Sequence, residues 1–238
     1  MTSGAQRTVL VTGATSGIGR AVAARLLEEG HRVVGVGRDF SKVSFAGSFA
    51  PVVLDLADLD ALPARLRDLA DEHPAVDALV LAAGRGLVGG LEQCSYRRLR
   101  ELIDLNVTSQ AFLVRAFVPA LKRRRQGDVV FIGSEAALRG ARQGAVYCAS
   151  KFALRGFAQA LRDECAKSGV KVSIVHPGMV RTPFFDDLAI TPGDGEENAL
   201  LPEEVAAAVA LVLAQRGGAV VDEIVLSPLK NVVRRRAH

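Results

Sequence analysis

The chain of 238 residues is poor in aromatic residues and in cysteine. It has no tryptophan, two tyrosines and ten phenylalanines, which argues against a protein that stacks sugars or single-stranded bases on rings. Its three cysteines, Cys94, Cys148 and Cys165, are odd in number and form no CxxC pair, so we expect neither a disulfide framework nor a zinc knuckle. The four histidines show no metal-ligand spacing, and we predict no metal site.

Long hydrophobic runs and a targeting segment are also missing. The longest apolar run, 205–214, is too short to cross a bilayer, and the first residues lack the layout of a signal peptide. The net charge is +4, with basic clusters at 122–125 and 234–236. We interpret these clusters as solvated loop ends, while a nucleic-acid or anionic-membrane surface remains the alternative and predicts salt-dependent binding. We therefore expect a cytoplasmic protein that binds neither nucleic acid nor membrane.

The chain alternates between strand-like and helix-like segments. Strands are predicted at 8–12, 32–36, 51–55, 76–82, 128–132, 171–175 and 220–226, and helices at 18–29, 59–72, 96–124, 146–168 and 203–215. The strands are nearly continuous in Val, Ile and Leu, which is typical of parallel strands buried on both faces. We predict an α/β fold in a single domain over residues 1–238, a Rossmann-type doubly wound parallel sheet of about seven strands with helices on both faces. Its ligands should bind beyond the carboxyl ends of the strands.

A glycine-rich turn joins the first strand to the first helix. Gly13 can turn tightly, Gly17 lets the backbone approach a phosphate, and Gly19 allows the helix to pack closely. The start of the helix then offers free N–H groups and a positive dipole to a pyrophosphate. The glycine spacing alone is weak evidence, but the flanking strand and helix strengthen it. The predicted cradle comprises Gly13, Thr15, Ser16, Gly17, Ile18 and Gly19.

A second group of residues can carry acid–base chemistry. Tyr147 and Lys151 lie one turn apart on the same face of a predicted helix. A lysine ammonium beside a phenol favours the phenolate and so lowers the pKa of the tyrosine, which could then exchange a proton with an alcohol or carbonyl. Ser134 follows the fifth strand, and Asn106 stands inside a long helix, where asparagine is a poor choice for stability.

These residues form one ordered set. It reads Thr12-Gly13-x-x-x-Gly17-Ile18-Gly19, Asp55, Asn106, Ser134, Tyr147-x-x-x-Lys151 and Pro177-Gly178-x-Val180-x-Thr182. The set resembles the classical short-chain dehydrogenase/reductase family over about residues 8 to 227. The resemblance implies hydride transfer with a nicotinamide cofactor, Tyr147 as general acid or base, and Ser134 as hydrogen-bond partner of the substrate oxygen. It further implies that Lys151 holds the ribose hydroxyls and lowers the Tyr147 pKa, and that Asn106 holds a water that completes a proton relay.

The resemblance also implies further cofactor contacts. Asp55, next to Leu56, would meet the adenine amino group, although it could merely cap the next helix. The Val180 backbone and the Thr182 hydroxyl would hold the carboxamide, although Thr182 could be only a turn residue. The fourth strand ends in Leu81-Ala82-Ala83-Gly84, where the family usually has Asn-Asn-Ala-Gly. We expect Ala82, Ala83 and Gly84 to keep their backbone contacts with the cofactor, while the bracing that the asparagines supply is in doubt.

The second strand bears on the choice between NADP and NAD. Its end is Gly37, without the carboxylate that would bind a ribose diol, and Arg38 follows with a guanidinium that can grip a 2′-phosphate. Asp39 is the counterargument, but it comes one or two positions late. We therefore expect NADP, with NAD as the less favoured alternative.

The segment 180–201 is the predicted substrate loop, and it suits a small-to-medium carbonyl or alcohol. The resemblance implies a homo-oligomer, a dimer or tetramer formed through the helices that carry Asn106 and Tyr147. The competing reading is a catalytically silent dinucleotide-sensing protein. Its only support is the altered segment Leu81-Ala82.

Overall fold

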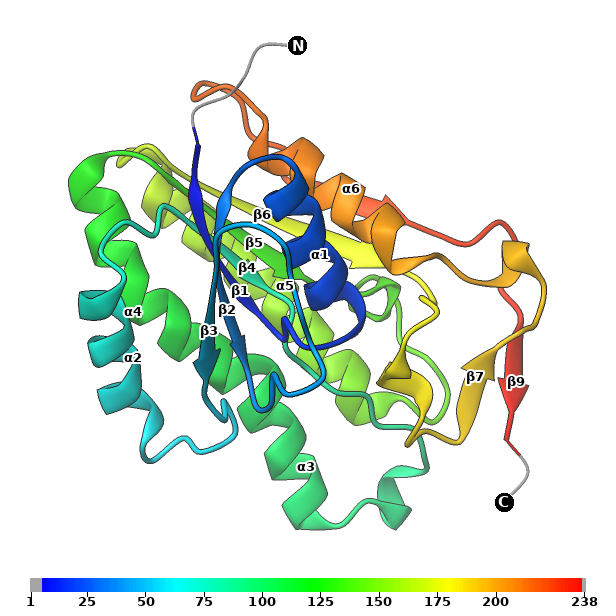
Figure 1. Cartoon of the computed structure of the whole chain (residues 1–238). Helices are drawn as coiled ribbons and strands as arrows, with labels where there is room; N and C mark the ends of the chain where they lie inside the picture. Colours follow the sequence, from blue (N-terminus) through cyan, green and yellow to red (C-terminus); the bar gives the residue numbers. More distant parts are fainter. Residues whose placement is uncertain (1–5, 237–238) are drawn as a thin grey trace.

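A seven-stranded parallel sheet forms the centre of the molecule in the computed structural model, which describes residues 6–236 (Figure 1). Its order is β3-β2-β1-β4-β5-β6-β8. The strands are β1 (Thr8–Thr12), β2 (Arg32–Gly37), β3 (Phe49–Val53), β4 (Ala78–Leu81), β5 (Gly127–Ile132), β6 (Val170–Pro177) and β8 (Glu223–Leu226). The chain order reverses between β1 and β4, which places a ligand crevice beyond the carboxyl ends of these two strands. The predicted doubly wound fold is confirmed.

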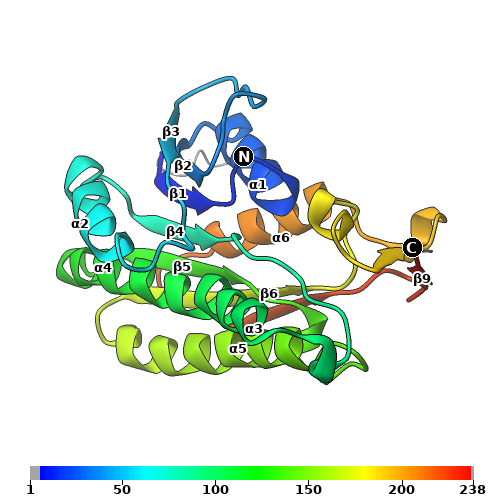
Figure 2. The ribbon, with the colours of Figure 1, turned by 90° about the horizontal axis from the view of Figure 1, so that it is seen from below.

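Helices cover both faces of this sheet (Figure 2). They are α1 (Gly17–Glu28), α2 (Leu62–Glu72), α3 (Tyr96–Ile103), α4 (Ser109–Arg124), α5 (Ala145–Ala166) and α6 (Pro202–Leu213). Alternate residues of β1 feed two cores, because Val9 and Val11 pack with α1 and α6, whereas Leu10 packs with α2, α4 and α5. The burial of both faces explains why the strand sequences are apolar throughout.

Three differences from the sequence prediction concern element limits. The predicted helix over 96–124 is interrupted by a π-helical turn at Asp104–Thr108, so α3 and α4 are separate. The third strand lies two residues earlier than predicted, and the last strand begins at Glu223 instead of residue 220. Short 3₁₀ turns also occur at Leu91–Gln93, Glu135–Ala137, Pro183–Phe185 and Glu196–Asn198.

A small second sheet was not predicted. β7 (Ile190–Pro192) lies in the predicted substrate loop and pairs antiparallel with β9 (Val233–Arg235) near the end of the chain, at the edge of the molecule in Figure 1. The cluster 234–236 is exposed to solvent, as interpreted, but Arg234 and Arg235 belong to a strand, and the segment contacts the predicted substrate loop. Arg234 forms an ion pair with Asp194, and the Arg236 backbone N–H donates to the Ala189 carbonyl at 3.0 Å.

The other basic cluster also contacts the protein. Arg124 donates to the Val76 carbonyl at 2.8 Å, and Arg125 donates to the Lys167 carbonyl at 3.3 Å. None of the helices between residues 6 and 236 is long and apolar enough to cross a membrane.

Candidate active site

The glycine turn adopts a backbone that needs its glycines. Gly13 and Gly17 have φ of +69° and +51°, in the left-handed region that side chains disfavour. A Cβ on Gly19 would collide with the carbonyl oxygen of Gly13, so α1 lies directly against the end of β1. Ser16 precedes α1 and makes no side-chain cap within the described chain, so the first N–H groups of the helix remain available to an anion.

The segment after β4 is braced by residues that sequence reasoning did not assign to this task. The Thr12 hydroxyl accepts hydrogen bonds from the backbone N–H groups of Ala82 and Ala83, both at 3.0 Å. The Gln110 amide donates to the Ala83 carbonyl at 3.0 Å. Bracing that was in doubt because the family's asparagines are missing is thus supplied from β1 and α4. The signal in the sequence was Thr12, a polar residue at the end of an apolar strand.

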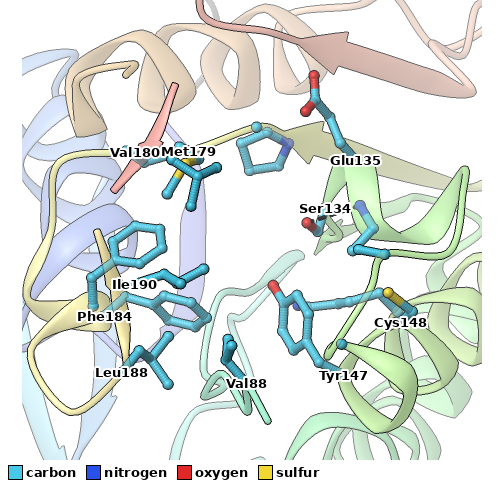
Figure 3. Close-up of a pocket in the computed structure, with 18 of the residues that line it drawn as sticks. Val88, Ser134, Glu135, Tyr147, Cys148, Met179, Val180, Phe184, Leu188 and Ile190 are labelled. Carbon is cyan, nitrogen blue, oxygen red and sulfur yellow. Dashed lines mark hydrogen bonds between the residues drawn. The ribbon is translucent and has the colours of Figure 1, made fainter. Parts of the chain in front are cut away.

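Ser134, Tyr147 and Lys151 lie close together because the carboxyl end of β5 lies next to the first turns of α5 in space. Ser134 follows β5, and Tyr147 lies in the first turn of α5, one turn before Lys151. The Tyr147 hydroxyl points toward Ser134 into a shared open space (Figure 3). The buried Lys151 Nζ donates to the Ile132 carbonyl at 3.0 Å and lies 5.8 Å from the centre of the Tyr147 ring.

The expected lowering of the Tyr147 pKa by Lys151 is not found in this structure. Burial raises the pKa of Tyr147 to about 12, and the Ser134 hydroxyl opposes this shift only in part. Burial also lowers the pKa of Lys151 to about 8. Since the ammonium donates to a backbone carbonyl and the protein surrounds the phenol on most sides, desolvation outweighs the attraction that the sequence spacing suggested.

Asn106 lies in the π-helical turn and is fully buried. Its side chain donates to the Ser150 hydroxyl at 3.2 Å and to the Arg85 carbonyl at 3.0 Å, and it accepts from the Arg85 backbone N–H at 3.0 Å. Ser150 in turn donates to the Tyr147 carbonyl at 2.7 Å. The asparagine therefore ties the loop after β4 to the first turns of α5. Such an interruption of a helix is frequent at functional sites.

The backbone of Ser134 contacts the side chain of His176, a residue to which the sequence analysis gave no role. The buried His176 Nδ1 lies 3.1 Å from the Ser134 carbonyl oxygen, and its ring fills the space where a Cβ on Gly133 would stand. Burial lowers the pKa of His176, while the Glu223 carboxylate acts in the opposite direction. The only sequence signal was its place before Pro177-Gly178.

One cavity of about 540 Å³ gathers much of the predicted site. The predicted residues that line it are Ile18, Ala82, Gly84, Ser134, Tyr147, Lys151, Val180 and Thr182. Thr182 also joins the cavity to the glycine turn, because its methyl carbon would lie 3.2 Å from a Cβ on Gly17. Its hydroxyl accepts from the Phe184 backbone N–H at 3.3 Å, so the turn role considered for Thr182 is present as well.

A family model described as short chain dehydrogenase matches residues 7–192. The chain belongs to the short-chain dehydrogenase/reductase family. Human retinol dehydrogenase 8 is 38% identical over 189 residues, which cover 76% of this chain and 61% of that protein. Sepiapterin reductase of Chlorobaculum tepidum is 31% identical over 241 residues, covering 92% of this chain and 95% of that protein. A metagenomic short-chain oxidoreductase crystallised in complex with NADP superposes with a TM-score of 0.78 at 30% identity, covering 93% of this chain and 96% of that one.

Further predicted residues of this chain lie away from the cavity, at the ends of β2 and β3. A Cβ on Gly37 would stand 2.5 Å from the Thr15 methyl carbon. Arg38 is exposed, whereas Asp39 accepts a hydrogen bond from the Ser41 backbone N–H at 2.8 Å. Asp55 is exposed and accepts from the Ala57 backbone N–H at 2.9 Å, which is a local turn contact, and Leu56 packs in the core.

The cavity is also lined by residues that the sequence analysis did not name individually. Val88, Met179, Phe184, Leu188 and Ile190 form an apolar side (Figure 3). Asn231, Val233 and Arg235 reach it from the tail, and Arg139, Arg142 and Gln143 from the loop before α5. The doublet Val232-Val233 was the one sequence signal for β9, and it is too short to identify a strand without its partner.

Proposed function

We propose that this protein is an NADP-dependent oxidoreductase that interconverts a small-to-medium carbonyl compound and its alcohol, with Tyr147 as the acid–base group. The observation that carries the proposal is the convergence of the Tyr147 and Ser134 hydroxyls in one cavity, opposite an apolar wall. When bound, the nicotinamide supplies the hydride, and the protein supplies orientation and the proton.

The proton chemistry follows from the side chains that are present. With a pKa raised to about 12, Tyr147 is a neutral phenol at pH 7 and can donate a proton to a carbonyl oxygen that gains negative charge. Ser134 is placed to donate a hydrogen bond to the same oxygen. Lys151 and Asn106 lie behind Tyr147, on the route by which we propose that the proton is replaced.

The chain offers a cradle that suits a dinucleotide. The left-handed Gly13 and Gly17, the close approach at Gly19 and the uncapped start of α1 together leave room and donors for a pyrophosphate. We propose that Thr15, Ser16 and Ile18 complete this cradle. Lys151 would hold the ribose, and Ala82, Ala83, Gly84, Val180 and Thr182 would contact the nicotinamide half. Asp55 and Leu56 would contact the adenine.

NADP is favoured over NAD by the packing at the end of β2. An acidic side chain at position 37 would have to displace Thr15, so the position that could hold a ribose diol is closed to a side chain. The Asp39 carboxylate is engaged with Ser41, and the hydrogen bonds from Ser41 lower its pKa. Arg38 is exposed beside the predicted site of a 2′-phosphate.

Parallel fluorescence titrations with NADPH and NADH test the cofactor. We expect tighter binding of NADPH and loss of this preference in Arg38→Ala, whereas tighter binding of NADH would refute the NADP assignment.

Turnover of carbonyl compounds with NADPH tests the chemistry. Tyr147→Phe should bind NADPH normally and lose roughly 10²- to 10⁴-fold in rate, which is the usual contribution of a positioned acid. Tyr96→Phe is the matched control, because Tyr96 is the other tyrosine and is 94% exposed. Undiminished turnover by Tyr147→Phe would refute the proton-donor role.

The competing function, a dinucleotide sensor without turnover, loses its one argument once Thr12 and Gln110 brace the Ala82–Ala83 segment. Binding of NADPH with no turnover of any carbonyl compound would restore it.

We also propose that the protein is a homo-oligomer formed through the outer faces of α4 and α5, where Phe152 remains 44% exposed. Light scattering after size-exclusion chromatography should give a dimer or tetramer, and a monomeric mass would contradict this.

A further inference from the structure

The end of the chain forms part of the substrate cavity. Arg235 pairs with Ile190 and Val233 with Pro192 in the antiparallel β7–β9 ladder. Alternate residues of a strand point to the same face, so Val233 and Arg235 face the cavity while Arg234 faces away. The ion pair between Arg234 and Asp194 agrees with this alternation.

Three arginines that line the cavity lack an acidic partner. They are Arg139, Arg142 and Arg235, which we call the basic rim. Within residues 6–236 no carboxylate lies in ion-pair distance of any of them, although Arg234 and Arg236 pair with Asp194 and Asp186. Carboxylates thus neutralise the charges of Arg234 and Arg236, whereas the charge of Arg235, which faces the cavity, is not neutralised.

Arg235 is held in place by the loop that carries the rest of the basic rim. Its Nη2 donates to the Gln143 Oε1 at 3.0 Å. Gln143 has a φ of +61°, which is unusual outside glycine, and its carbonyl accepts from the Gly89 backbone N–H at 2.8 Å. Three segments of the cavity wall, the loop after β4, the loop before α5 and β9, therefore meet at one residue. A guanidinium fixed in this way is prepared for a planar anion.

The acidic residue of the cavity does not neutralise the basic rim. Within residues 6–236, Glu135 forms no ion pair with any of the three arginines. Its carboxylate instead accepts a hydrogen bond from the Ser227 hydroxyl. Its carboxylate points away from the Tyr147 hydroxyl in Figure 3. The same cavity has an apolar wall, in which Phe184, Leu188 and Ile190 lie opposite Tyr147.

We propose that the substrate is a carbonyl compound with an apolar body and an anionic end, a carboxylate or a phosphate, which binds the basic rim. This inference rests on the proposed function and adds the class of its substrate. The apolar wall would contact the body of the molecule while the carbonyl oxygen meets Ser134 and Tyr147. Arg235 would bind the anionic group, with Arg139 and Arg142 adding positive potential at the entrance.

The first experiment compares three substrates with the same carbon chain. They are 6-oxoheptanoate, its methyl ester and 6-oxoheptyl phosphate, each reduced with NADPH by the full-length protein. We expect kcat/KM for one of the two anions to exceed that for the ester by about 10- to 100-fold, the usual value of a charge-assisted hydrogen bond pair. Which anion is preferred identifies the group. Arg235→Gln should remove this preference by lowering kcat/KM for the preferred anion toward that for the ester. Arg234→Gln is the matched control and should keep the preference.

The second experiment does not depend on turnover. Calorimetric binding of heptanoate, heptyl phosphate and heptanamide to the NADPH-loaded protein should show an anion bound at least about tenfold more tightly than the amide, and Arg235→Gln should equalise them. Equal kcat/KM for acid, phosphate and ester would overturn the anionic substrate and leave the proposed oxidoreductase intact. If none of the three oxo compounds is reduced but an anion binds through Arg235, the proposed function is refuted and the anion site is supported. Absence of both anion-dependent binding and turnover would refute both.

Discussion

The charge of Lys151 is part of the proposed chemistry, but its burial destabilises the folded protein. Its ammonium is buried with one hydrogen bond to the Ile132 carbonyl, and burial lowers its pKa from 10.5 to about 8. A shift of this size means that holding the charge in the folded protein costs about 3 kcal/mol at neutral pH. Replacing Lys151 with methionine, which has similar length and no charge, removes this cost.

The size and sign of the effect depend on pH in a defined way. Below about pH 8 the lysine is charged in both states, and the full cost is present. Between pH 8 and 10.5 the unfolded chain binds more protons than the folded one, so the wild-type protein gains stability relative to the variant as pH rises. The variant leaves the Ile132 carbonyl without this donor, which costs about 1 kcal/mol at every pH.

We therefore expect Lys151→Met to be about 2 kcal/mol more stable than wild type at pH 7 and about 1 kcal/mol less stable above pH 10.5. The assay is urea unfolding of the cofactor-free proteins, followed by far-UV circular dichroism at several pH values and equal concentration. Turnover by the variant should be lost throughout. A difference in unfolding free energy that stays constant from pH 7 to 10.5 would refute the argument, because it would show that Lys151 has an ordinary pKa in the folded state.

Three further substitutions test the supports of the site. Thr12→Val keeps the shape of the side chain but leaves two backbone N–H groups without an acceptor, so urea unfolding should show a loss of about 2 kcal/mol and NADPH titration weaker binding. Gly19→Ala forces α1 away from the end of β1 and should cost about 1–3 kcal/mol in the same assay, with NADPH affinity reduced more than by any change on the outer face of α1. Asp128→Ala removes the buried carboxylate that Arg7, just before β1, and Lys171 of β6 share, and it should cost about 3–5 kcal/mol, while kcat of the folded fraction stays unchanged.

The geometry of the glycine turn and of the Tyr147–Lys151 pair was predictable because its requirements are local. The turn from β1 into α1 needs glycine at fixed positions, and Gly13, Gly17 and Gly19 meet those needs within seven residues. Tyr147 and Lys151 share one turn of one helix, so their proximity follows from helix geometry alone. The continuous apolar strands likewise predicted the parallel sheet, because burial on both faces leaves no polar alternation.

The electrostatics of the same residues were not predictable from spacing. Spacing places Lys151 near Tyr147, but the pKa of each group depends on how much water surrounds it and where the ammonium points. Both are tertiary properties. The same holds for Asn106, since a π-helical turn has no sequence signature comparable to a glycine turn, and for Thr12, whose partners lie 70 and 71 residues away.

The tail side of the cavity was not predicted, for a different physical reason. β9 is three residues long and, among residues 6–236, pairs only with β7, so neither strand has a pattern that identifies it alone, and its arginines resemble an ordinary solvated tail. Yet this tail reaches the cavity through alternate residues while Arg234 and Arg236 fasten it to the loop. In the proposed function, catalysis and specificity are thus assigned to separate parts of the fold. We therefore expect that changes at 231, 233 and 235 alter substrate preference and keep the proposed chemistry, because they do not touch the β5–α5 corner that holds Ser134 and Tyr147.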